Sequence, residues 1–136
     1  YKKKMKFNHI GIFSRNITKG ESTLGNIFKV KKASKIFYDK KMSVKVKFLY
    51  DYKNICYEIV SPYGKANPVK KVLEKSNNIL NHVAYTTKNF DKKIIELRKK
   101  GFAPIINPIK SKAFGGKKVC FFLTPLNFII EVIENE

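Results

Sequence analysis

Two histidines and two glutamates are the residues of this chain whose types and spacing could do chemistry. His9 and His82 are the only histidines among the 136 residues, and Glu58 and Glu131 each stand inside an otherwise apolar run. The spacing from histidine to glutamate is the same in both cases, since 58 − 9 and 131 − 82 both give 49. Two imidazoles and two carboxylates suit a divalent cobalt, nickel, zinc, manganese or iron ion. The sequence therefore predicts one divalent metal ion bound by these four side chains.

The alternative is that both histidines are ordinary strand residues and that both glutamates point to solvent. A carboxylate within an apolar strand is costly to bury unless it is paired or bound to a cation. One such histidine and glutamate would favour the ordinary interpretation. Two pairs at one spacing favour the metal site, with water completing the shell and leaving a position open for substrate.

An internal repeat places these side chains on equivalent elements. Residues 8–13 and 81–86 both open with Asn-His and continue as short apolar runs typical of strands. The segment after the second run predicts a helix with Asn89 as N-cap, an apolar face at positions 90, 94 and 97, and Gly101 as C-cap. The segment after the first run predicts a shorter helix, capped by Thr18 or Ser22 and interrupted by Gly20.

Each half then contains three further strand candidates. They are residues 28–37, 43–51 and 55–61 in the first half, and 102–109, 118–124 and 127–134 in the second. Tight turns are expected at 51–54 and 124–127. This pattern predicts an α+β fold of two tandem βαβββ modules that form a curved mixed sheet around a metal cleft. We expect a single domain over 1–136, with module one at about 6–62, a linker helix at about 65–77 and module two at about 78–135.

Composition narrows the class of protein. The net charge is +19, but only Arg15 and Arg98 are arginine, and the lysines are spread along the whole chain. Specific nucleic-acid recognition favours the planar fork of arginine, so we do not expect a nucleic-acid partner. The lysines either cover solvated faces without a specific role or favour a small anionic substrate. Cys56 and Cys120 form no metal-binding motif and are expected to be reduced and buried. We find no apolar run long enough for a membrane span and no secretory signal, so we expect a cytoplasmic protein without a membrane partner.

The ordered set of motifs resembles the vicinal oxygen chelate superfamily, which includes glyoxalase I, methylmalonyl-CoA epimerase, extradiol dioxygenases and fosfomycin or bleomycin resistance proteins. Within it the chain looks most like the methylmalonyl-CoA epimerase branch. Five segments carry this resemblance. The histidines lie in residues 7–12 and 80–85, and the glutamates lie in residues 57–64 and 129–132. The fifth segment, residues 115–125, begins with Gly-Gly-Lys.

The resemblance implies an epimerase or isomerase that removes a proton next to a carbonyl group and stabilises the enolate with the metal. Glu131 or Glu58 would be the base, and Asp39 is the candidate for a second acid/base group in the segment before Val44. Gly116, Lys117 and Lys118 would hold an anionic tail such as that of an acyl-CoA, and we expect a homodimer. A glyoxalase I-type lactoylglutathione lyase and a non-catalytic ligand- or drug-binding protein are the alternatives on the same scaffold.

Overall fold

The structure is a computed structural model that describes residues 4–64 and 80–135. Two compact units emerge from it, which we call the N-terminal unit (residues 9–81) and the C-terminal unit (residues 1–8 and 82–136). The linker helix expected at 65–77 lies outside the described residues. The expected organisation as one domain stays a prediction.

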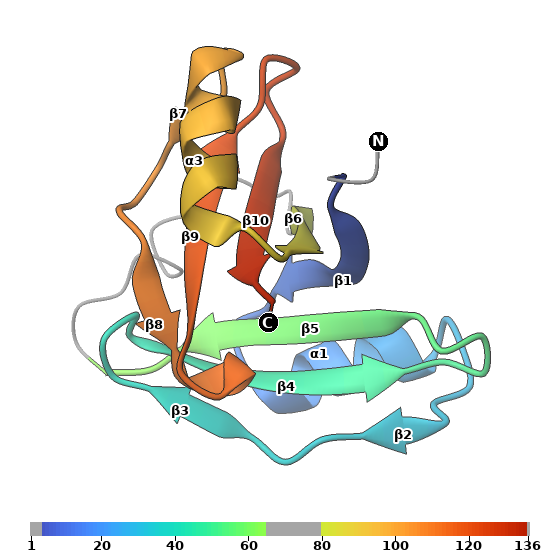
Figure 1. The fold of residues 1–136 in the computed structure, drawn as a ribbon. Coiled ribbons are helices and arrows are strands. Elements are labelled where there is room, and N and C mark those ends of the chain that lie inside the picture. The colour runs from blue at the N-terminus through green and yellow to red at the C-terminus, as the bar shows by residue number, and fades with distance from the viewer. Residues whose placement is uncertain (1–3, 65–79, 136) are drawn as a thin grey trace. The chain divides into compact units, whose positions relative to one another are not determined.

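In its described residues the N-terminal unit combines the helix α1 with a mixed sheet (Figure 1). The sheet has the order β2-β4-β5-β1, with β3 also paired to β4; β1 is parallel to β5, and the other pairs are antiparallel. Its elements are β1 (Lys6–Phe13), α1 (Ile17–Gly25), β2 (Lys32–Ala33), β3 (Phe37–Asp39), β4 (Val44–Tyr50) and β5 (Cys56–Pro62).

The C-terminal unit repeats this plan. Its sheet has the order β6-β10-β9-β7, with β8 also paired to β9; β6 is parallel to β10, and the other pairs are antiparallel. Its elements are β6 (Leu80–Thr87), α3 (Phe90–Lys99), β7 (Ala103–Pro104), β8 (Ile109–Ser111), the short 3-10 helix η1 (Lys112–Phe114), β9 (Lys117–Leu123) and β10 (Ile129–Glu134). The predicted α+β fold with two βαβββ modules is therefore confirmed.

The second strand of each module differs from the prediction. Residues 28–37 and 102–109 do not form continuous strands, and each module instead has two short strands that pair with the same neighbour. In the first module the Ser34 hydroxyl accepts a hydrogen bond from the Phe48 amide at 2.9 Å, where a strand would offer a carbonyl. In the second, Pro104 and Pro108 lack the amide N–H that a continuous ladder needs.

Both predicted hairpin turns are present, and they are built alike. Asn54 and Asn127 adopt left-handed backbone angles, with φ of 62° and 67°. Each donates its amide to the carbonyl three residues earlier, on Asp51 and Thr124. The side chains of Asp51 and Thr124 accept two further backbone amides each. Asparagine tolerates the left-handed region better than most residues, so the sequence specifies both turns.

The N-terminus and middle of α1 correct the sequence prediction. Asn16, and not Thr18 or Ser22, is the N-cap, and its side chain accepts the Lys19 amide at 2.7 Å. Gly20 does not interrupt the helix. A Cβ placed there would lie 2.6 Å from Cγ2 of Ile59 on β5, so the missing side chain lets α1 approach the sheet closely.

Replacing Gly20 by alanine should therefore destabilise the protein, by about 1–3 kcal/mol through overpacking against Ile59. Gly25, at the last position of α1, is the matched control, because a Cβ there meets nothing within 4 Å. Gly25→Ala should leave stability unchanged or raise it by a few tenths of a kcal/mol. Chemical denaturation of the two variants measures the difference, and equal midpoints would contradict the close approach of α1.

Helix α3 follows the prediction at its N-terminus and along its buried face. Its N-cap is Asn89, and Phe90, Ile94 and Leu97 are buried against Phe122 and Val132 of the sheet. The C-cap is Lys100 and not Gly101 as predicted, and Gly101 follows it with φ of 91°, where a glycine avoids the strain of the left-handed region. Among the described residues we find no helix with the length and apolar character that crossing a membrane requires.

The two cysteines are buried and unpaired thiols, as expected. Burial raises the pKa of both Cys56 and Cys120 to about 11. At pH 8 only about a thousandth of each native thiol would be thiolate, against about a quarter in an unfolded chain. Iodoacetamide at pH 8 should thus label the native protein very slowly and label it fully in 6 M guanidinium. Rapid labelling of the native protein would contradict this burial.

Candidate metal centre

The first histidine and glutamate lie on neighbouring parallel strands of the N-terminal unit. His9 is in β1 and Glu58 is in β5, where the register places Gly11 opposite Glu58. His9 Nε2 lies 3.2 Å from Glu58 Oε1. The two residues are 0% and 5% exposed, so their polar atoms face each other away from bulk solvent.

The second histidine and glutamate occupy the equivalent strands of the C-terminal unit. His82 is in β6 and Glu131 is in β10, with Ala84 opposite Glu131. His82 Nε2 lies 3.1 Å from Glu131 Oε1, and the residues are 3% and 2% exposed. The equal spacing in the sequence therefore corresponds to equal strand positions and to nearly equal geometry.

A small residue stands next to each glutamate. Gly11 and Ala84 are register partners of Glu58 and Glu131, and each follows its histidine by two residues. Partners in adjacent parallel strands direct their side chains to the same face of the sheet. Gly11 and Ala84 consequently leave room on that face beside each carboxylate.

An aromatic ring contacts each histidine, and sequence reasoning missed both rings. Phe48 lies edge-on to His9 with ring centroids 5.9 Å apart, and Phe121 lies edge-on to His82 at 5.3 Å. Phe48 is the register partner of Glu58, and Phe121 is the register partner of Glu131. Each phenylalanine follows its histidine by the same number of residues, since 48 − 9 and 121 − 82 agree. That spacing was the available signal.

The donor atoms of each pair have the separation that a shared ion would give them. Two ligands at about 2.1 Å from one ion, at roughly a right angle, lie about 3.0 Å apart. The observed 3.1 and 3.2 Å are close to this value. Without an ion each pair would be a hydrogen-bonded imidazole and carboxylate, and metal titration distinguishes the two states. Within residues 4–64 and 80–135, the side chains that could offer donor atoms to a metal ion are those of His9, Glu58, His82 and Glu131, and all four are buried.

Asp39, the candidate second acid/base group, lies at the end of β3. Its register partner is Val44, and Val44 is in turn the partner of Pro62. Because side chains alternate along β5, Asp39 and Glu58 belong to the same face of the sheet in the N-terminal unit. Asp39 is buried, and its Oδ1 accepts the Met42 amide at 3.0 Å. One carboxylate oxygen thus holds the turn that leads into β4.

The predicted substrate-binding residues lie at the entry to β9. Gly115 and Gly116 both have positive φ, of 66° and 85°, and Lys117 is half-buried. Lys118 is already engaged, because its Nζ lies 2.8 Å from Asp91 Oδ1. The hydrogen bond that Lys118 donates to Asp91 raises the pKa of Lys118. An anionic ligand would compete with Asp91 for Lys118, and the substrate-binding roles of Gly116, Lys117 and Lys118 stay predictions.

A comparison with protein families gives a match over most of the chain. The profile described as the Glyoxalase/Bleomycin resistance protein/Dioxygenase superfamily matches residues 8–121. That range includes His9, Glu58 and His82. No curated protein matches the sequence significantly.

Solved structures similar to this chain include several epimerases. A hypothetical protein from Bacillus halodurans has a TM-score of 0.83 at 23% identity, covering 98% of this chain and 96% of its own. Methylmalonyl-CoA epimerase from Mycobacterium tuberculosis has a TM-score of 0.78 at 14% identity, covering 96% and 88%. A Streptomyces coelicolor methylmalonyl-CoA epimerase variant in complex with 2-nitronate-propionyl-CoA has a TM-score of 0.71 at 17% identity, covering 96% of each chain. At these identities the similarity shows the fold.

Proposed function

The chain belongs to the glyoxalase/bleomycin resistance protein/dioxygenase superfamily, and from this we propose that it is a metal-dependent epimerase or isomerase of the methylmalonyl-CoA epimerase type. The observation that carries the proposal is the pair of buried histidine–glutamate contacts on equivalent strands, at 3.2 and 3.1 Å. Buried carboxylates of this kind need a cationic partner, and the superfamily supplies a metal for that purpose.

His9, Glu58, His82 and Glu131 would together hold one divalent ion, and the donor set fits cobalt, nickel, zinc, manganese or iron(II). The ion would supply Lewis-acid stabilisation of the negative charge that develops on a substrate carbonyl oxygen. Phe48 and Phe121 contact the imidazoles and exclude water from them, and this strengthens electrostatic interactions at the donors. His82 is the register partner of Ile129 in the parallel ladder of β6 and β10, which fixes its backbone.

The glutamates are the groups that would move the proton. Glu131 or Glu58 would remove the proton next to the carbonyl, which requires a carboxylate within hydrogen-bonding reach of that carbon. An epimerase also needs a group that returns the proton to the opposite face. Asp39 is our candidate, because it belongs to the same sheet face as Glu58 and its Oδ1 is already oriented by the Met42 amide.

The substrate we propose is a small carboxylated acyl thioester such as an acyl-CoA. A similar solved structure is described as methylmalonyl-CoA epimerase in complex with methylmalonyl-CoA and NH4+. The net charge of +19 favours an anionic substrate of this class by electrostatic attraction. Gly116 and Lys117 would contact its anionic part.

We also propose that the protein is a homodimer. Sedimentation equilibrium of the purified protein measures its oligomeric state.

The experiment that tests the function is solvent exchange of the α-proton. Metal-loaded protein in deuterium oxide should incorporate deuterium at the α-carbon of methylmalonyl-CoA, as followed by NMR. Formation of lactoylglutathione from methylglyoxal and glutathione, without exchange, would replace the epimerase with a glyoxalase I-type lyase. Ligand binding without turnover of either substrate would replace it with a binding protein.

A further inference from the structure

A polar cavity lies wholly within the C-terminal unit. Its volume is about 210 Å³, and it lies where the parallel strands β6 and β10 end and α3 begins. Two threonines and two asparagines contribute to its wall. Its charged lining consists of Lys4, Lys6, Lys88, Lys92, Lys93 and Glu96. His82 and Glu131 are not among the residues that line it.

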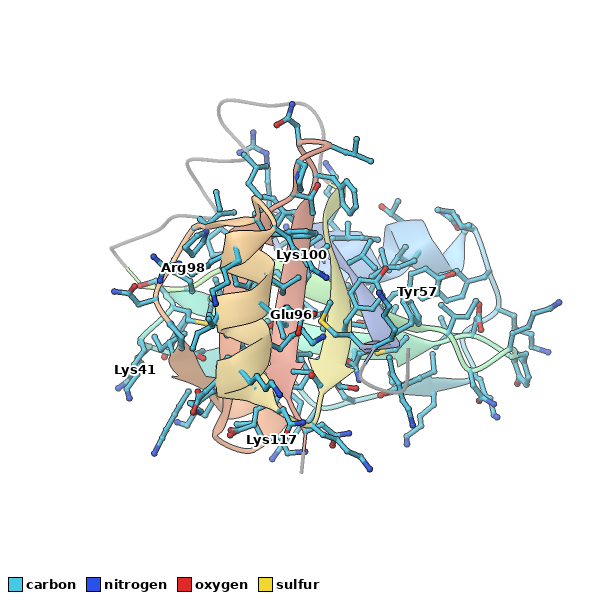
Figure 2. The ribbon with its side chains drawn as sticks, turned by 45° about the horizontal axis from the view of Figure 1, so that its top comes forward. Lys41, Tyr57, Glu96, Arg98, Lys100 and Lys117 are labelled. Carbon is cyan, nitrogen blue, oxygen red and sulfur yellow. The ribbon has the colours of Figure 1, made fainter. Side chains whose placement is uncertain are left out.

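The charges around this cavity are strongly unbalanced. Five lysines and one carboxylate, that of Glu96, line the cavity, and Glu96 also contacts a lysine outside the lining. Oε1 of Glu96 lies 3.4 Å from Lys93 Nζ and 3.5 Å from Lys100 Nζ. Lys100 is the C-cap that directly follows α3, and it does not line the cavity; Figure 2 labels Glu96 and Lys100. The hydrogen bond from Lys93 lowers the pKa of Glu96, so the single negative charge is present at neutral pH. The cavity therefore keeps a large excess of positive charge for an anion to neutralise.

Lys93 points to a ligand most directly, because it is buried. The residue is 7% exposed, although lysine is almost never fully buried unless paired. Its contact with Glu96 at 3.4 Å is long for a charge-assisted hydrogen bond, which is usually about 2.7–2.9 Å. By comparison, Lys118 and Asp91 in the same unit lie 2.8 Å apart. The ammonium group of Lys93 thus retains donor capacity toward the cavity.

The start of α3 adds backbone donors at the same place. Asn89 is the N-cap, and its side chain makes no capping hydrogen bond with the described part of the helix. Amide groups of a first helical turn and the helix dipole favour an anion, and phosphate groups commonly bind there. The residues just before the helix, Thr86 to Asn89, all line the cavity and offer hydroxyl and amide donors.

We propose that this cavity binds the phosphate groups of a phosphorylated ligand, separately from the metal-binding residues. Five ammonium groups match a ligand with several negative charges, and the volume suits a diphosphate group rather than a whole nucleotide. The shared chemistry is a diphosphate, either free or at the end of a larger molecule. The proposal does not depend on the metal or on the epimerase activity.

Calorimetric titration with inorganic pyrophosphate in low salt tests this directly. We expect one pyrophosphate per chain, and the double variant Lys88→Gln/Lys92→Gln should weaken binding at least tenfold. Lys93→Met, which keeps the apolar stem and removes the ammonium, should weaken it as well. A parallel titration with ADP identifies the source: tighter binding than pyrophosphate indicates a nucleotide, and equal or weaker binding indicates a free diphosphate.

The matched control is the double variant Lys40→Gln/Lys53→Gln. It removes two exposed lysines of the N-terminal unit and so lowers the net charge by the same amount. The control should bind pyrophosphate within about twofold of the original protein, and His82→Ala should bind it equally well. Equal losses in the two double variants would show general attraction to a basic protein and would overturn the proposal.

Discussion

Replacing His82 by alanine should abolish stoichiometric metal binding. His82 Nε2 lies 3.1 Å from Glu131 Oε1, so the imidazole and the carboxylate would share one ion, and the variant loses one of four ligands. Loss of an outer partner of a metal ligand alone costs about 10–100-fold in affinity, so loss of the ligand should cost at least about a hundredfold. Equilibrium dialysis against a divalent metal, followed by elemental analysis, measures the change.

Tyr85→Ala is the control for general damage to β6. Tyr85 lies three residues further along the strand and packs against the cluster around Phe90. This variant should be less stable than the original protein but should keep its metal. If His82→Ala retained the ion at the original affinity, the assignment of His82 as a ligand would be wrong.

Replacing Glu131 by glutamine should have the second large effect, on exchange of the α-proton. The amide has nearly the same shape as the carboxylate, but it cannot accept a proton at neutral pH. Removing a general base typically costs about 10²–10⁴-fold in rate. NMR in deuterium oxide, with enough metal to saturate the variant, measures the exchange rate. Glu58→Gln should be measured in parallel, because the two glutamates occupy equivalent strand positions.

Glu134→Gln provides the matched control on the same strand. Glu134 is also in β10, but its Oε1 accepts the Lys118 amide at 3.0 Å and its side chain is about one-third exposed. Its replacement should leave the exchange rate within about twofold. Original exchange rates in both Glu131→Gln and Glu58→Gln would exclude the glutamates as bases.

The repeat made much of the fold predictable. Asn54 and Asn127 identified the hairpins, Phe90, Ile94 and Leu97 identified the buried face of α3, and the equal spacing of histidine and glutamate located the equivalent strands. These features depend on residues close in sequence or on a pattern that occurs twice. Local patterns of this kind are visible without coordinates.

The features that were missed depend on tertiary contacts. Gly20 looked like a helix breaker, and only its distance to Ile59 explains why a glycine is required within α1. Phe48 and Phe121 read as ordinary strand residues until the register placed them opposite the glutamates. The cavity at the start of α3 combines lysines from the two separate segments of the C-terminal unit, residues 4–6 and 88–93, and no short motif connects them.

The number of metal ions per chain tests the central claim most directly. We propose that both histidine–glutamate pairs contribute to one site, so titration of the metal-free protein should saturate at one divalent ion per chain. His9→Ala should then lose that ion as completely as His82→Ala does. Two ions per chain, with each histidine variant losing only one of them, would contradict a shared site. Failure of the original protein to bind any divalent ion would contradict the metal centre altogether.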